Sequence, residues 1–191
     1  ISIVEGFLDS FTLLFNGLFS AAWSAFVVAA FTEELFKYLV LFMLIWKSPE
    51  FNEKFDGIVY AVFVSLGFAG VENVLYIIGS GVETGLIRAI TAVPAHAIFG
   101  ITMGFYFGMA KFYEKERRIL KQKALFYPIL LHGVYDFILF TGIAWLTIVF
   151  VGFVVYLYIS GLKRVKDLSD LSIYNTDYNL LNEKFTKSDV I

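Results

Sequence analysis

The sequence predicts an all-α protein: a polytopic transmembrane helical bundle of about five spans, with a short segment before the first span. This prediction is based on the amino-acid composition. Of 191 residues, 59% are hydrophobic, 19% are aromatic and only 17% are charged, and the mean hydropathy is +0.75. A water-soluble domain is about half apolar and roughly a quarter charged. The chain has 22 Phe and 11 Tyr, too many for one water-soluble core of this size. Lipid around the bundle accounts for this excess.

The same composition excludes several kinds of site. Because the chain has no Cys, disulfides, iron–sulfur clusters, Cys-ligated zinc and a Cys nucleophile are excluded. The net charge is −2 and the pI is about 5.7, so no basic surface of the kind that binds nucleic acid is expected. The sequence begins with Ile1, which we expect to be a truncated or processed end.

Five apolar stretches are long enough to be spans, since about 20 apolar residues cross ~30 Å of hydrocarbon. The region from Phe7 to Trp46 is too long for one span, and Asn16-Gly17 is the natural break within it. This leaves Phe7–Phe15 as a short segment at the membrane interface. The predicted spans are Leu18–Trp46, Asp56–Gly79, Leu86–Ala110, Ala124–Thr141 and Gly142–Leu162. We therefore divide the chain into a transmembrane bundle over 1–162 and a polar tail over 163–191.

Basic residues orient the predicted bundle, because Lys and Arg concentrate in cytoplasmic loops. The connections Gly79–Gly85 and Thr141-Gly142 contain none. The other two loops and the start of the tail are basic, with Lys47, Lys54, Lys111, Lys115, Arg117, Arg118, Lys121, Lys123, Lys163, Arg164 and Lys166. Five crossings require this alternation, so we expect the basic loops and the C-terminus in the cytoplasm and residue 1 outside.

Ionisable side chains lie inside four of the predicted spans, where they are costly and usually functional. They are Glu33, Glu34 and Lys37 in the first span, Glu72 beside Asn73 in the second, His96 in the third, and His132 with Asp136 in the fourth. A rise of 1.5 Å per residue places them at similar depth, near or above the midplane. Structural residues that only bridge helices have no reason to agree in depth. The sequence therefore predicts one site.

Local spacing supports this site. His132 and Asp136 are four residues apart and share a helix face, as a metal pair or an orienter–base pair requires. Glycines follow His96 at intervals of four residues, which lets another backbone approach and turns the His96 face into the bundle. These glycines are Gly100, Gly104 and Gly108. The pair Gly67 and Gly70 predicts close packing in the same way just before Glu72.

The residue types favour water-dependent bond cleavage inside the membrane. A carboxylate in a low-dielectric site can serve as general base or acid. Two His with further carboxylates can hold Zn²⁺ or polarise a water directly, and the residues leave both routes open. No HExxH or GxSxG motif is present. A proton- or ion-coupled transporter uses the same residue types and is the alternative function. A scaffold whose polar cluster locks helices together is a third.

Four short motifs resemble those of the PrsW family of intramembrane proteases. Residues 33–37, EELFK, are similar to its EExxK motif, and residues 68–73, FAGVEN, to its FxxxEN motif. Arg88 through His96 resembles its third, His-bearing motif, and residues 132–136, HGVYD, its HxxxD motif. Order and spacing match over about residues 30–140. The resemblance implies a membrane-embedded endopeptidase of a bacterial or archaeal cell membrane, distantly related to the CAAX prenyl protease superfamily.

The resemblance also implies roles for the residues. Glu33 or Glu34 would activate water, with Glu33 preferred, and His96 and His132 would position the water or bind a metal. The substrate would be a membrane-anchored protein, such as an anti-sigma factor. No oligomeric state is predicted.

Four further residues would support these catalytic residues. Lys37 would pair with one of the two glutamates, and Asp136 would orient His132. Asn73, His132 or a metal would stabilise the oxyanion. Glu72 would either join the two His as a metal ligand or bridge helices by a hydrogen bond. If the site holds a metal, we expect Zn²⁺.

Overall fold

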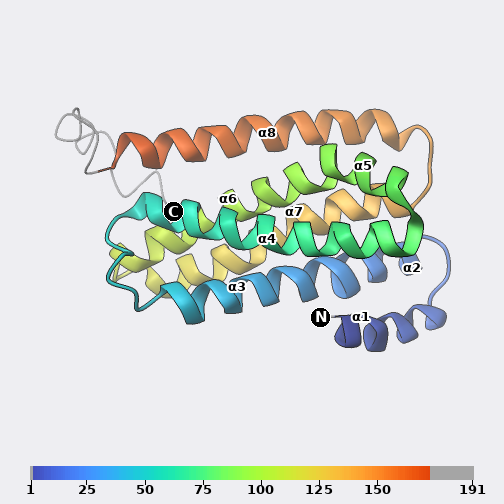
Figure 1. Ribbon diagram of the computed structural model, residues 1–191, viewed down its shortest axis with the longest axis horizontal. Helices are drawn as coiled ribbons and strands as arrows, with labels where there is room; N and C mark the ends of the chain where they lie inside the picture. The colour runs from blue at the N-terminus through green and yellow to red at the C-terminus, as the bar shows by residue number, and fades with distance from the viewer. Residues whose placement is uncertain (1, 173–191) are drawn as a thin grey trace.

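The computed structural model describes residues 2–172, and this part of the chain is an all-helical bundle (Figure 1). In chain order, it contains α1 (Ser2–Asp9), the 3₁₀ helix η1 (Ser10–Leu14), α2 (Leu18–Trp23), the π-helical segment η2 (Ser24–Phe31), α3 (Thr32–Ile45), α4 (Lys54–Ser80), α5 (Val82–Ile90), α6 (Ala92–Phe112), α7 (Arg117–Phe140) and α8 (Leu146–Asp170).

Four helical stretches are long and apolar enough to cross a membrane: Asp56–Ser80, Val82–Phe112, Arg117–Phe140 and Ile148–Asp170. Large apolar side chains on them are exposed, including Phe63, Ile78 and Ile148. Exposed apolar side chains are stable in contact with lipid, and a helix in lipid satisfies its backbone polar groups internally. The predicted all-helical membrane bundle is confirmed, and the protein is an integral membrane protein.

The first predicted span, Leu18–Trp46, corresponds to α2, η2 and α3, which follow one another without a gap. The predicted break before it is confirmed: Gly17 has φ +58, a conformation that glycine adopts without strain. The π-helical segment ends at Phe31, and regular α-helix resumes at Thr32. Both Glu33 and Glu34 therefore lie in the first turn of α3, next to an irregular helix of the kind often found at functional sites.

The third predicted span, Leu86–Ala110, is not one helix. It is divided at Thr91 into α5 and α6. Pro94 explains the division, because its ring has no N–H and clashes with the carbonyl four residues earlier, that of Ile90. Proline is tolerated in the first turn of a helix, so α6 begins just before it.

The helix that contains the fourth predicted span begins before that span. Helix α7 starts at Arg117 rather than Ala124, so most of the basic residues assigned to this loop lie on the first turns of α7. The turn after α7 is slightly longer than predicted and uses Gly142 with φ +63. Helix α8 extends to Asp170, past the predicted end of the bundle at Leu162. The remainder of the predicted tail, 173–191, lies outside the described residues.

Helix α6 packs on α4 through glycine. A Cβ added at Gly57 of α4 would lie 2.6 Å from the carbonyl oxygen of Gly104 and from backbone atoms of Gly108. At Gly100, a Cβ would lie 2.7 Å from the Ser65 hydroxyl. The predicted close approach along the His96 stripe is therefore confirmed, and His96 is buried. The corresponding prediction for Gly67 and Gly70 is wrong, since a Cβ at either would meet nothing within 4 Å.

Candidate active site

Four of the predicted site residues, from three helices, lie close together. Glu33 and Glu34 come from α3, His96 from α6 and His132 from α7, and all four are buried. Each offers one ligand atom, and these atoms lie within 4.8 Å of one another. We call these four residues the Glu/His cluster. These four residues, which the sequence places at similar depth, therefore lie together in the structure.

Lys37 lies inside this cluster. Its Nζ donates to Glu34 Oε1 at 2.7 Å and to Glu33 Oε2 at 3.2 Å, and it lies 2.9 Å from His96 Nδ1. The Lys37 side chain is 0% exposed. Its ammonium also lies 4.6 Å from the centre of the Phe68 ring, a cation–π distance. The lysine therefore pairs with both glutamates, whereas we expected it to pair with one of the two.

His96 is held on both sides of its ring. Nδ1 faces Lys37, and Nε2 lies 3.2 Å from Glu72 Oε2, an ion-pair distance without the alignment of a hydrogen bond. Glu72 Oε1 in turn lies 2.7 Å from Arg88 Nη2. The Arg88 guanidinium stacks 3.7 Å from the centre of the Tyr76 ring. A chain of contacts thus runs from α5 through α4 to His96.

His132 has a similar arrangement. Its Nδ1 lies 2.9 Å from Glu34 Oε1, and its Nε2 lies 3.2 Å from Asp136 Oδ2. The ring stacks on Phe99 at 4.9 Å between centroids and an interplanar angle of 16°. In both His, Nδ1 therefore faces the cluster while a carboxylate stands behind Nε2.

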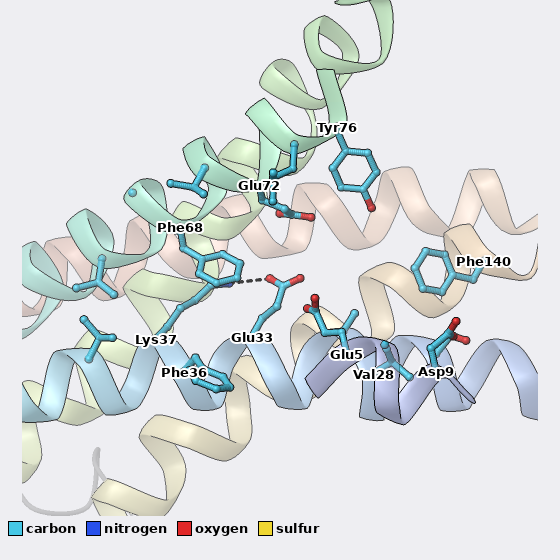
Figure 2. Close-up of a pocket in the computed structure, with 18 residues that line it drawn as sticks. Glu5, Asp9, Val28, Glu33, Phe36, Lys37, Phe68, Glu72, Tyr76 and Phe140 are labelled. Atoms are coloured by element: carbon cyan, nitrogen blue, oxygen red, sulfur yellow. Dashed lines mark hydrogen bonds and ion pairs between the residues drawn. The ribbon is translucent and has the colours of Figure 1, made fainter. Parts of the chain in front are cut away.

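The two glutamates differ in their access to open space. Glu34 has a side chain that is 0% exposed, whereas that of Glu33 is 7% exposed. Glu33 lines a cavity of about 910 Å³ between α3 and α4, which we call the α3–α4 cavity (Figure 2). It also lines a cavity of about 350 Å³ shared with His96 and His132, the inner cavity. Glu34 lines neither cavity.

The walls of the α3–α4 cavity are mostly apolar, and four acidic groups also line it, Glu5, Asp9, Glu33 and Glu72. Figure 2 shows Glu33, Glu5 and Asp9 on one side of the open space, and Glu72 and Tyr76 of α4 on the other. A molecule in this cavity could therefore reach Glu33 directly.

One predicted site residue lies elsewhere. Asn73 donates from Nδ2 to the carbonyl oxygen of Gly85 at 3.1 Å, which ties α4 to α5. It therefore lies outside the Glu/His cluster. Asp136 and Lys37 contact members of the cluster, and Glu72 stands behind His96 rather than among the four residues that can share one ion.

Sequence reasoning missed two contributors. Arg88 and Phe99 were not assigned to the site, although signals for both were present. Arg88 is a basic residue within an otherwise apolar stretch, and Phe99 follows His96 by three residues on the same helix face. Their partners, Glu72 and His132, come from other helices.

The residues present fit a divalent metal in type and spacing. Two imidazoles and two carboxylates are a common donor set for Zn²⁺. A carboxylate behind each imidazole is the arrangement that orients metal-binding His in proteins. Glu34 Oε2 is buried without a hydrogen-bond partner, so the cluster has a free acceptor atom. A buried Glu-Glu-His-His group of this kind can bind a metal ion.

Comparison with known proteins gives a consistent result. Residues 1–160 match the model of the PrsW family of intramembrane metalloproteases. Three similar curated proteins are all named Protease PrsW. That of Geobacillus kaustophilus is 47% identical over 126 residues (66% of this chain, 56% of the relative). That of Halalkalibacterium halodurans is 44% identical over 142 residues (74% and 66%). That of Bacillus subtilis is 42% identical over 143 residues (74% and 65%).

The chain therefore spans about two thirds of the length of these relatives, or less. No solved structure matches it. The resemblance that the four motifs indicated is confirmed.

Proposed function

Because this chain belongs to the PrsW family of intramembrane metalloproteases, we propose that it hydrolyses a peptide bond in a membrane-anchored protein substrate. The observation that carries the proposal is the position of Glu33. It is the one carboxylate of the Glu/His cluster that lines both cavities. A base must lie within reach of the water it activates.

Access to the site supports the same function. The α3–α4 cavity is mostly apolar and opens beside Glu33, so an unwound substrate segment can reach the cluster from the bilayer. We propose that such a segment lies along α3 and α4, with its scissile carbonyl at the level of Glu33. An anti-sigma factor with a single membrane anchor is a substrate of this class.

Glu33 performs the proton transfers in this mechanism. Its carboxylate removes a proton from water as the water attacks the carbonyl carbon, and then gives that proton to the leaving amine. With no metal in the cluster, His132 would stabilise the oxyanion, since Asn73 faces Gly85 instead. Asp136 orients His132 from behind.

Glu34, His96 and His132 would hold a zinc ion, which leaves Glu33 free as the base. Three protein ligands and one open position are typical of catalytic zinc. When bound, the ion supplies Lewis-acid polarisation of the carbonyl or water. In this arrangement Glu72 and Asp136 are the carboxylates that orient the two His.

The chain crosses the membrane five times in this proposal, with α2, η2 and α3 together forming the first crossing. One end of the bundle holds the α3–α4 connection, the α6–α7 connection and the end of α8 (Figure 1). The opposite end holds the α4–α5 and α7–α8 connections. The basic residues concentrate at the first end, which is therefore cytoplasmic.

Mapping of new protein N-termini tests the function. The full-length protein and its Glu33→Gln variant are expressed in a bacterial host, and free N-termini in the membrane fraction are labelled and sequenced by mass spectrometry. We expect termini within or beside membrane anchors for the unaltered protein and none for Glu33→Gln. Glu83→Gln, on the exposed side of α5, is the control and should keep them.

Identical termini from the unaltered protein and Glu33→Gln would contradict the assignment. Charge movement into liposomes that depends on Glu33, without any new termini, would instead support an ion-coupled transporter.

A further inference from the structure

Lys37 occupies the centre of the donor set that would bind a metal. An ammonium has three N–H donors, and three acceptors surround this one: Glu34 Oε1, Glu33 Oε2 and His96 Nδ1, at 2.7, 3.2 and 2.9 Å. All three acceptors belong to residues of the Glu/His cluster. The side chain that satisfies them is itself completely buried.

A metal ion and this ammonium cannot use these atoms together. Glu34 Oε1 is already shared between Lys37 and His132 Nδ1, at 2.7 and 2.9 Å. An ion bound among the four residues would also lie within a few ångströms of Nζ, where two positive charges repel strongly in a medium of low dielectric. The lysine therefore has to leave before a divalent ion can take its place.

The structure offers a route for this movement. Lys37 also lines the α3–α4 cavity, where its side chain runs beside Phe68 toward Glu33 (Figure 2). A lysine stem is flexible, so rotation about its side-chain bonds would carry the ammonium from the cluster into the cavity. The carboxylate of Glu5 lines the same cavity and offers the displaced charge a partner.

We infer that Lys37 is a built-in competitor of the metal: its ammonium and a divalent ion occupy the Glu/His cluster in turn, and the cluster binds zinc weakly while Lys37 is in place. This inference rests on the metal-binding role in the proposed function. It adds that the cluster keeps its charge balanced by its own cation when no metal is bound.

Zinc affinity measured on the purified, detergent-solubilised full-length protein tests this inference. Zn²⁺ is titrated in competition with a chromophoric chelator. We expect Lys37→Met, which keeps the length and loses the charge, to bind Zn²⁺ at least about tenfold more tightly than the unaltered protein. Lys111→Met is the matched control. It removes a partly buried lysine that donates to the Trp46 carbonyl far from the cluster, and it should leave the affinity unchanged.

A second measurement needs no variant, in case Lys37→Met fails to fold once two buried carboxylates lose their cation. Reductive methylation of the unaltered protein, followed by peptide mass spectrometry, reports how accessible each lysine amine is. We expect Lys37 to react slowly without zinc and several-fold faster with saturating Zn²⁺, while Lys111 does not change.

Equal or weaker zinc binding by folded Lys37→Met would overturn the inference, as would Lys37 reactivity that does not respond to zinc. Failure to bind zinc in both proteins would overturn it too. None of these outcomes bears on whether new N-termini depend on Glu33, so failure of the inference and failure of the proteolytic function can be told apart.

Discussion

Helix α4 is packed in two different ways on its two sides. Toward α6, glycine meets glycine: a Cβ at Gly57 would lie 2.6 Å from backbone atoms of Gly104 and Gly108. Toward α3, a different glycine of α4, Gly67, faces open space. It lines the α3–α4 cavity, and a Cβ there would meet nothing within 4 Å. The same residue type therefore serves close packing on one side and leaves room for a ligand on the other.

This difference explains where the site lies. The close α4–α6 contact fixes Glu72 and His96 relative to each other, since a backbone-to-backbone contact leaves little freedom. The open side gives Glu33 access to a cavity. A catalytic carboxylate needs rigid partners and an accessible substrate, and Glu33 stands at the boundary between the two.

Among the substitutions that test this comparison, we expect the largest effect from a change in stability that differs between the two sides of α4. Gly57→Ala forces a methyl group against the α6 backbone and should destabilise the protein by about 1–3 kcal/mol. Gly67→Ala has open space and should leave stability unchanged or raise it by about 0.4–1 kcal/mol. Thermal melting in detergent measures both. Equal melting temperatures would remove the distinction between the sides.

Filling the cavity tests its role in substrate access. Gly67→Trp places an indole in the α3–α4 cavity and should slow cleavage by about 10–100-fold through substrate misplacement. Gly70→Trp is the control, because Gly70 lies on the same helix with open space around it but does not line this cavity. Initial cleavage rates of a substrate found by N-terminal mapping provide the comparison. Equal rates for the two variants would argue against access by this route.

Asp136→Asn probes the support behind His132. The amide keeps the shape of the carboxylate but loses its charge, and loss of such an orienting group typically costs about 10–100-fold in metal affinity or activity. We expect the lower end, about tenfold in cleavage rate, because Glu34 still holds Nδ1 of the same ring. A loss as great as that of Glu33→Gln would make Asp136 a direct participant rather than an orienting residue.

The smallest effect is expected at Asn73. Asn73→Ala removes a hydrogen bond to Gly85 and should lower stability by about 0.5–1.5 kcal/mol. The cleavage rate per folded molecule should change by less than about threefold. A much larger loss of rate at normal substrate affinity would restore the oxyanion role that the FxxxEN motif suggested.

Part of this site could be read from the sequence because helix geometry is regular. A fixed rise per residue brought Glu33, His96 and His132 to one level, and the structure places them together. Spacing of four residues correctly indicated that His132 and Asp136 share a face. The glycines after His96 identified a packed face for the same reason.

Other features depend on tertiary contacts that no local pattern contains. Both glutamates are within reach of Lys37, at three and four residues, so spacing could not show that only Glu33 faces the cavities. The pairing of Glu72 with Arg88 requires the turn at Gly81 and the separation of α5 from α6 at Thr91. Gly67 was misjudged because a small residue fits both a close contact and an empty space.

The most direct test of the central claim compares Glu33→Gln with Glu34→Gln in one experiment that records cleavage rate and melting temperature. We expect Glu33→Gln to lose cleavage and to melt less far below the unaltered protein than Glu34→Gln does, because Glu33 has one hydrogen-bond partner in the cluster, Lys37, and lines the cavities. We expect Glu34→Gln to melt much lower, since Glu34 contacts both Lys37 and His132 in the fully buried part of the cluster. Loss of one partner of a buried ion pair costs about 3–5 kcal/mol. Full cleavage by Glu33→Gln, with loss only in a stably folded Glu34→Gln, would contradict the assignment of Glu33 as the base.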